Sequence, residues 1–147
     1  MPDPQYILVA VETASIQSYI FASNRLKENV GASYLVAAAT GDWALDAIHK
    51  MESEINIRSN LTPDNDAPFT GVKIEDGGLD VEVLYSGGGN IVLLFAETGF
   101  ASNEFGENKL PKGSYSRTFI QKLSQRVQLD APGLALTFSA VPFVWDE

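Results

Sequence analysis

The sequence predicts an α+β domain built on one four-stranded antiparallel sheet, with its elements in the order βαββαβ. Two continuous apolar runs, Tyr6–Val11 and Ile91–Phe95, indicate strands that are buried on both faces. A tight link, Ser86-Gly87-Gly88-Gly89-Asn90, joins the second run to the alternating segment before it, which is a strong β-hairpin signal. Segments with helical periodicity lie before and after this hairpin.

The first helical region follows the first strand and is predicted to break once, near Gly31. Its first part, Ser15–Asn29, places its apolar side chains near one face. Its second part, Ala32–Ile55, is rich in alanine, and we expect its larger apolar side chains to be buried: Leu35, Val36, Trp43, Ile48, Met51 and Ile55. The polar segment Asn56–Gly71 is predicted to be a surface loop.

The middle of the chain supplies the hairpin. Val72–Glu75, followed by two glycines, is predicted to add a short extra strand. Val81–Tyr85 alternates, with Val81, Val83 and Tyr85 on one face, as an edge strand does. Ile91–Phe95 is apolar on both faces and therefore central.

The last third supplies a helix and a strand. Apolar side chains recur every four residues from Tyr115 to Val127, which predicts an amphipathic helix with Ser114 as its N-cap. Pro132 and Gly133 end the helix, and Leu134–Ala140 alternates as the final strand. This order is that of a ferredoxin-like fold with the sheet order 4-1-3-2 and both helical regions on one face. Because both central strands are apolar throughout, we expect the other face to be covered as well.

Composition bounds the classes of function. The 147 residues suffice for one domain, and we expect residues 1–147 to be a single domain of a longer protein. The chain has no cysteine and a single histidine, which excludes thiolate chemistry and any site with two imidazoles. Its net charge of −9 opposes an extensive nucleic-acid-binding surface. With no apolar run long enough to span a membrane and no recognisable signal peptide, a cytoplasmic location is expected.

The topology predicts where chemistry could occur. The end of the first strand and the glycine link share one rim of the sheet, so Glu12 should lie beside Gly87–Asn90. The first helix should begin near Ser15, and its free N–H groups together with an open glycine backbone would favour an anion. A neighbouring carboxylate could hold Mg²⁺ along with substrate phosphates. By themselves these features also fit a plain turn that requires positive φ and a solvated glutamate.

Two motifs resemble a known family. The first is the segment Val-Glu12-Thr-Ala-Ser15-Ile-Gln17-Ser-Tyr-Ile-Phe with the following Leu26-Lys-Glu-Asn-Val-Gly-Ala-Ser33, and the second is Leu84-Tyr-Ser-Gly-Gly-Gly-Asn90. Together they resemble the palm domain of the large, polymerase/cyclase-like subunit of type III CRISPR effector complexes. The similarity covers roughly residues 6–40 and 81–96.

The resemblance implies a function. Palm domains of this family and of the related GGDEF cyclases bind nucleoside triphosphates with divalent metal. In the CRISPR subunit two palm domains face each other and make cyclic oligoadenylates from ATP. One carries a Gly-Gly-Asp-Asp hairpin, and the other a glycine-rich hairpin without aspartates. This chain resembles the second, because Gly89 and Asn90 stand where the aspartates would be and Glu12 replaces the aspartate of the first strand.

The expected site follows from these two arguments. Its nucleotide-binding residues would be Ser15, Gln17, Ser86, Gly87, Gly88, Gly89 and Asn90, and Glu12 would bind Mg²⁺. Within the same motif, Lys27 could meet phosphate.

Three hypotheses remain open. The leading one is an ATP-binding, non-catalytic half of a cyclase-type pair, whose partners would be a second palm domain and a CRISPR effector complex. The second is a degenerate palm that acts as a scaffold or interaction module. The third is a self-sufficient cyclase in which Asp80 or Glu82 joins Glu12, since two-metal phosphoryl transfer requires several carboxylates.

Overall fold

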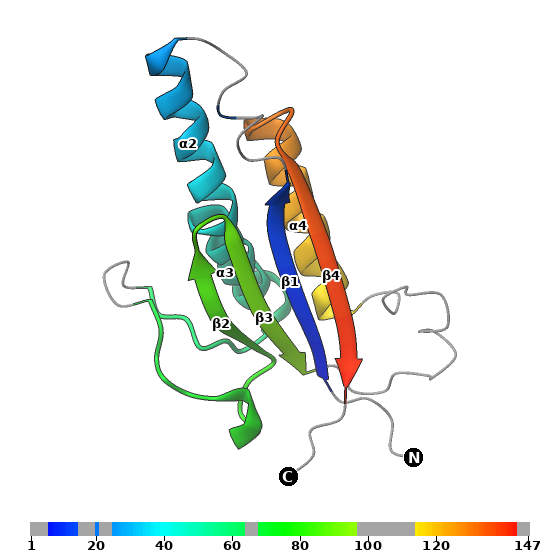
Figure 1. Cartoon of the computed structure of the whole chain (residues 1–147). Helices are drawn as coiled ribbons and strands as arrows, with labels where there is room; N and C mark the ends of the chain where they lie inside the picture. Colours follow the sequence, from blue (N-terminus) through cyan, green and yellow to red (C-terminus); the bar gives the residue numbers. More distant parts are fainter. Residues whose placement is uncertain (1–5, 15–19, 21–24, 64–67, 97–113, 144–147) are drawn as a thin grey trace.

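The computed structural model describes residues 6–14, 20, 25–63, 68–96 and 114–143. The strands are β1 (Tyr6–Ala14), β2 (Val81–Gly87), β3 (Asn90–Ala96) and β4 (Ala135–Phe143). The helices are α2 (Leu26–Thr40), α3 (Asp42–Ile55), the short 3₁₀ helix η1 (Ile74–Asp76) and α4 (Tyr115–Asp130). The strands form one antiparallel sheet in the order β2-β3-β1-β4, with α3 and α4 behind it (Figure 1). The predicted fold class and strand order are confirmed.

The main core lies between the sheet and the helices. Alternate residues of β1, namely Ile7, Val9 and Val11, are fully buried on this side. Phe119 of α4 packs against Phe95 of β3, with 5.8 Å between the ring centroids. We call this side of the sheet the helix face and the other side the open face. Among the described residues, no helix is long and apolar enough to cross a membrane.

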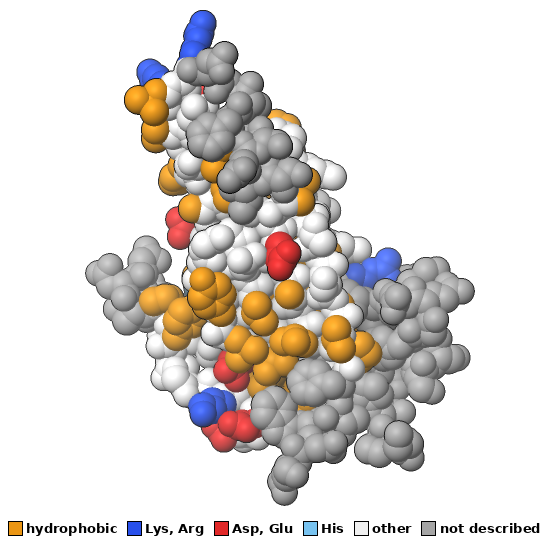
Figure 2. All heavy atoms as spheres, in the orientation of Figure 1, with side chains coloured by type: hydrophobic (Ala, Val, Ile, Leu, Met, Phe, Trp, Pro, Cys, Tyr) orange, Lys and Arg blue, Asp and Glu red, His pale blue; other side chains and the backbone are white. Residues whose placement is uncertain are grey.

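The open face is covered only in part by this chain. Ile74 of η1 and the nearby Leu79 pack on Leu94 of β3, and this small cluster covers the end of the sheet away from the hairpin turn. Hydrophobic side chains still gather on the exposed part of the face (Figure 2). Tyr85 and Val141 lie on this face, and each is about half exposed.

The extra strand predicted at Val72–Glu75 is wrong, because this segment leads into η1. The backbone N–H of Ile74 donates to the Glu82 carboxylate at 2.7 Å, while the Ile74 side chain is buried against the sheet. The segment is therefore held by the hydrogen bond to Glu82 and by burial of Ile74, and not by backbone pairing with a strand.

The predicted helix break near Gly31 is also wrong. Gly31 lies inside α2 with open space around it, and the break falls at Gly41, between α2 and α3. At Gly41 a Cβ atom would lie 2.9 Å from the carbonyl oxygen of Ala37, closer than real Cβ contacts, so the chain turns where only glycine fits. Ile55, expected in the core, is 42% exposed because α3 ends there.

The predicted surface loop Asn56–Gly71 is partly structural. Asn60 is buried, and its side-chain amide donates to the carbonyl of Val83 at 3.0 Å and accepts from the Val83 N–H at 2.8 Å. Ser59 forms a parallel bridge to Val81. An edge strand exposes unpaired backbone groups, and Asn60 satisfies those of Val83 in β2.

The final helix and strand agree with expectation. The Ser114 hydroxyl accepts from the N–H of Arg117 at 3.2 Å, which confirms the predicted N-cap of α4. The helix continues to Asp130, and β4 follows after the turn at Pro132 and Gly133.

The two glycines of the helical region provide a matched pair of substitutions. Gly41→Ala should lower the free energy of unfolding by about 1–3 kcal/mol, because the new methyl group clashes with the Ala37 carbonyl. Gly31→Ala should raise it by about 0.5–1 kcal/mol, because alanine suits an unobstructed helix interior. Urea unfolding followed by circular dichroism measures both, and changes of the same sign would contradict this assignment of the break.

Candidate functional site

The β2–β3 hairpin turns through two glycines. Gly87 and Asn90 form its last pair, and Gly88 and Gly89 are the residues between them. Their φ angles are 63° and 88°, positive at both positions as in a type I′ turn. Residues that have a Cβ atom rarely adopt positive φ angles at two successive positions, and this explains why the turn residues are glycines.

Thr13 of β1 fixes this turn in place. The carbonyl oxygen of Gly89 accepts from the Thr13 N–H at 3.0 Å and from the Thr13 hydroxyl at 3.1 Å. Both Thr13 and Gly89 are buried. The Gly89 carbonyl is therefore turned inward and fully engaged, so it belongs to the support of the site and is closed to a ligand.

Ser86 ties the hairpin to a helix. Its hydroxyl donates to the backbone carbonyl of Thr40, the last residue of α2, at 2.8 Å. The contact lies on the helix face, because Ser86 pairs with Ile91, whose side chain is in the main core. Together Thr13 and Ser86 hold the turn from two directions.

Glu12 lies on the open face, opposite Asn90 of β3 on one side and Thr137 of β4 on the other. It is exposed, whereas its neighbours Val11 and Thr13 point to the helix face and are buried. The topology predicted this proximity of Glu12 and Asn90. Directly opposed residues of antiparallel strands point to the same face, so one row across the sheet contains Gly87, Asn90, Glu12 and Thr137.

Tyr85 was placed on the wrong face by the sequence pattern. The register shifts between Val83 and Tyr85, which leaves Leu84 as the extra residue of a β-bulge. Tyr85 consequently pairs with Val92 on the open face, while Val83 is buried on the helix face. The tyrosine hydroxyl lies 3.6 Å from the position of a Cβ atom on Gly87 or on Gly88. A bulge leaves no simple mark in the alternation, so sequence reasoning missed this neighbour of the turn.

Other predicted residues are not brought to the turn. Ser15 and Gln17 lie outside the described residues, and β1 continues through Ala14, where the first helix was expected to begin. Lys27 is exposed in the first turn of α2, about 20 Å along the helix from the end that contacts Ser86.

The acidic residues of the third hypothesis anchor loops at the far end of β2. The Asp80 carboxylate accepts from the Arg58 N–H at 2.8 Å, and the Glu82 carboxylate accepts from the Ile74 N–H at 2.7 Å. In the sheet, Glu82 is level with Leu8, four residues before Glu12 on β1 and about 13 Å from it. In the part of the chain that the structure describes, no three His, Cys, Asp or Glu side chains form a metal cluster. A cation at Glu12 would take its other protein oxygens from neutral groups such as Asn90 and Thr137.

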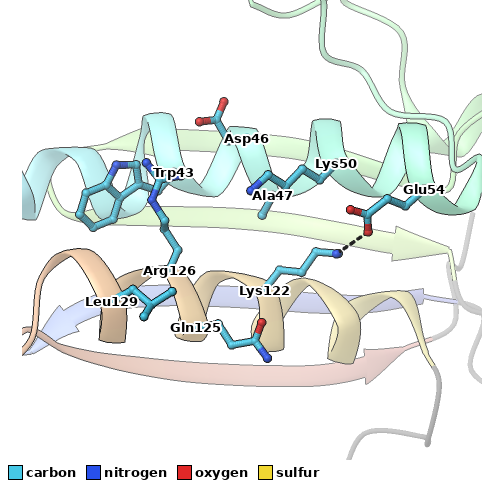
Figure 3. Close-up of a pocket in the computed structure, with 9 residues that line it drawn as sticks. All are labelled: Trp43, Asp46, Ala47, Lys50, Glu54, Lys122, Gln125, Arg126 and Leu129. Atoms are coloured by element: carbon cyan, nitrogen blue, oxygen red, sulfur yellow. Dashed lines mark hydrogen bonds and ion pairs between the residues drawn. The ribbon is translucent and has the colours of Figure 1, made fainter.

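A hollow of about 250 Å³ lies elsewhere, between α3 and α4 (Figure 3). Lys122 donates to Glu54 there at 2.7 Å; this hydrogen bond, followed by the lysine charge, lowers the pKa of Glu54. The guanidinium of Arg126 stacks 5.0 Å from the Trp43 ring centroid. None of the lining residues belongs to the hairpin: they are Trp43, Asp46, Ala47, Lys50, Glu54, Lys122, Gln125, Arg126 and Leu129. The candidate site is thus a surface at the hairpin, separate from this hollow.

Comparison with known proteins supports the fold. No family model matches the sequence, and no curated protein matches it. Two crystal structures of a Csm1–Csm4 cassette, from a type III CRISPR effector, are similar to it: one in complex with one ATP and one with cA4. Each has a TM-score of 0.58, with 11% and 10% sequence identity respectively. The match covers 97% of this chain and 17% of the matched chain. The resemblance read from the two motifs is thus confirmed at the level of the fold.

The contact between Thr13 and Gly89 can be tested by unfolding. Thr13→Val keeps the shape of the side chain and removes its hydroxyl, so we expect a loss of about 1 kcal/mol in the free energy of unfolding. Thr137→Val is the control, because Thr137 is exposed in the same row of the sheet, and its change should stay within about 0.5 kcal/mol. Equal losses in urea unfolding would show that the contact has no special weight.

Proposed function

We propose that this chain binds ATP or a similar nucleotide with Mg²⁺ on the open face beside the glycine turn, as the non-catalytic half of a cyclase-type pair of palm domains. The fold similarity to an effector cassette that is crystallised with ATP and with cA4 supports this proposal. The match covers only 17% of the matched chain, so it does not include a second palm domain or the rest of an effector complex. We propose both as partners of this chain.

The observation that carries the proposal is the position of Glu12 relative to the turn. Glu12 is exposed in the same row as Gly87 and Asn90. Gly87 and Gly88 have no side chains, and the Tyr85 hydroxyl lies 3.6 Å from the position of a Cβ atom on either, so a phosphate group could approach their backbone beside that hydroxyl. Phosphates would be repelled by a net charge of −9, and a Mg²⁺ ion shared by Glu12 and the phosphates would offset that repulsion.

The number of carboxylates supports the proposed non-catalytic role. Two-metal phosphoryl transfer requires several carboxylates around both ions. Across the described row at the hairpin end, Glu12 is the sole acidic residue, and Asp80 and Glu82 bind loop backbone elsewhere. The partner palm domain would therefore supply the metal-binding groups for chemistry.

Calorimetry with ATP and Mg²⁺ tests the binding site. The wild-type chain should bind, and Gly88→Val should abolish binding, because valine at a φ of 63° distorts the turn at a cost of about 1–3 kcal/mol. Gly77→Val is the matched control: it introduces the same kind of strain at a φ of 86°, beside η1 and away from the turn. Absence of binding at millimolar ATP would favour the scaffold hypothesis, and equal binding by Gly88→Val would reject the turn as the site.

Glu12→Gln tests the metal. This variant should lose most of the increase in ATP affinity that Mg²⁺ produces, because the amide cannot neutralise the cation. Glu28→Gln makes the same change of charge at an exposed residue in the first turn of α2 and should behave as wild type. Titrations with Mg²⁺ and with EDTA give the comparison. If both variants keep the full effect of Mg²⁺, Glu12 is not the metal ligand.

A product assay separates the third hypothesis. Incubation of the chain alone with ATP and Mg²⁺ should yield neither cyclic nor linear oligonucleotides if a partner palm domain supplies the metals. Accumulation of such products by chromatography would instead support a self-sufficient cyclase.

A further inference from the structure

We infer that Tyr85 is the aromatic contact for the base of the bound nucleotide, so that the base lies over the open face next to the glycine turn. This inference rests on the proposed function and adds to it the place of the base.

The first argument is the bulge at Leu84. In a regular strand Tyr85 would share the helix face with Val81 and Val83, both buried there. The extra residue brings Tyr85 opposite Val92, on the open face. Bulges commonly redirect a side chain beside functional sites. Here the bulge interrupts the regular pairing of β2 with β3 at one residue, and as a result the ring of Tyr85 lies on the surface.

The second argument is the exposure of the ring beside the turn. Tyr85 is 54% exposed, although large aromatic side chains gain most from burial. Its hydroxyl is within 3.6 Å of the Cβ positions of Gly87 and Gly88, so side chains there would contact it. The ring and the bare glycine backbone therefore adjoin, one suited to a flat base and the other to an anionic group.

The third argument is the surface between the ring and Glu12. Tyr85, Val92, Ala10 and Ser139 form one row across the open face, and only small or β-branched side chains follow the tyrosine. The row that contains Glu12 lies two residues along the strands, about 7 Å away. A base against Tyr85 would point its phosphates toward Glu12 and the turn, where the metal is proposed. A base is uncharged, so the negative field of the chain does not oppose its contact with the ring.

A simpler role for Tyr85 is to shield the turn. That role predicts that removal of the ring weakens every ligand of the turn equally. A contact with the base predicts a loss for ATP alone, because inorganic triphosphate has the phosphates and no base. The two roles are therefore separated by the choice of ligand.

The experiment compares ATP with inorganic triphosphate, both with Mg²⁺, by calorimetry. Tyr85→Ala should weaken ATP binding by about tenfold, as expected for loss of one base–aromatic stack, and leave triphosphate binding unchanged. Tyr85→Phe keeps the ring and should bind ATP nearly as wild type does. Tyr34→Ala removes another exposed tyrosine, on α2, and should change neither affinity.

The outcomes distinguish this inference from the function on which it rests. If wild type binds ATP and Tyr85→Ala binds it equally well, the inference is wrong and the proposed function stands. An equal loss for both ligands assigns Tyr85 to support of the turn and also overturns the inference. If wild type binds no ATP, both fall.

A second measurement avoids any dependence on the stability of the variants. The ring proton resonances of Tyr85 in wild type, assigned by comparison with Tyr85→Phe, should shift when ATP is added and stay in place with triphosphate. Ring resonances that do not respond to bound ATP would overturn the inference even if Tyr85→Ala fails to fold.

Discussion

The arrangement of the candidate site depends on the two hydrogen bonds from Thr13 to the carbonyl of Gly89. A two-glycine turn has little conformational preference of its own, and glycine loses more entropy on ordering than any other residue. The buried end of β1 supplies the missing constraint, and Ser86 adds a second one from α2. Because Thr13 points to the helix face, the adjacent Glu12 must point to the open face, so the same strand supports the turn and presents the carboxylate.

The edge of the sheet decides what surrounds the turn. Among the described strands β2 lies at the edge of the sheet, and the Asn60 side chain satisfies both backbone groups of Val83 there. The bulge begins at the next residue, Leu84, and it moves Tyr85 to the open face. Leu84 therefore separates the residue that Asn60 pairs at the edge, Val83, from the tyrosine beside the candidate site, Tyr85.

The two faces of the sheet differ in what covers them. On the helix face the hairpin is held by the main core and by the contact between Ser86 and Thr40. The open face carries Glu12, Asn90 and Tyr85 with small residues between them, and its far end is covered by η1. Under the proposed function, the net charge of −9 would be offset by the Mg²⁺ ion that accompanies the nucleotide to the open face.

The sequence by itself determined the element order, the central position of the two apolar strands, the glycine hairpin and the nearness of Glu12 to Asn90. These features follow from local patterning and from the limited ways of pairing four strands. Only the tertiary structure decided the helix break at Gly41, the course of residues 72–76 and the face on which Tyr85 lies. The break at Gly41 depends on the close approach of the Ala37 carbonyl, which hydrophobic periodicity does not report. The course of residues 72–76 depends on the contact of Ile74 with Glu82, and the edge next to the bulge is paired by Asn60 with Val83. Periodicity within one segment does not reveal such contacts.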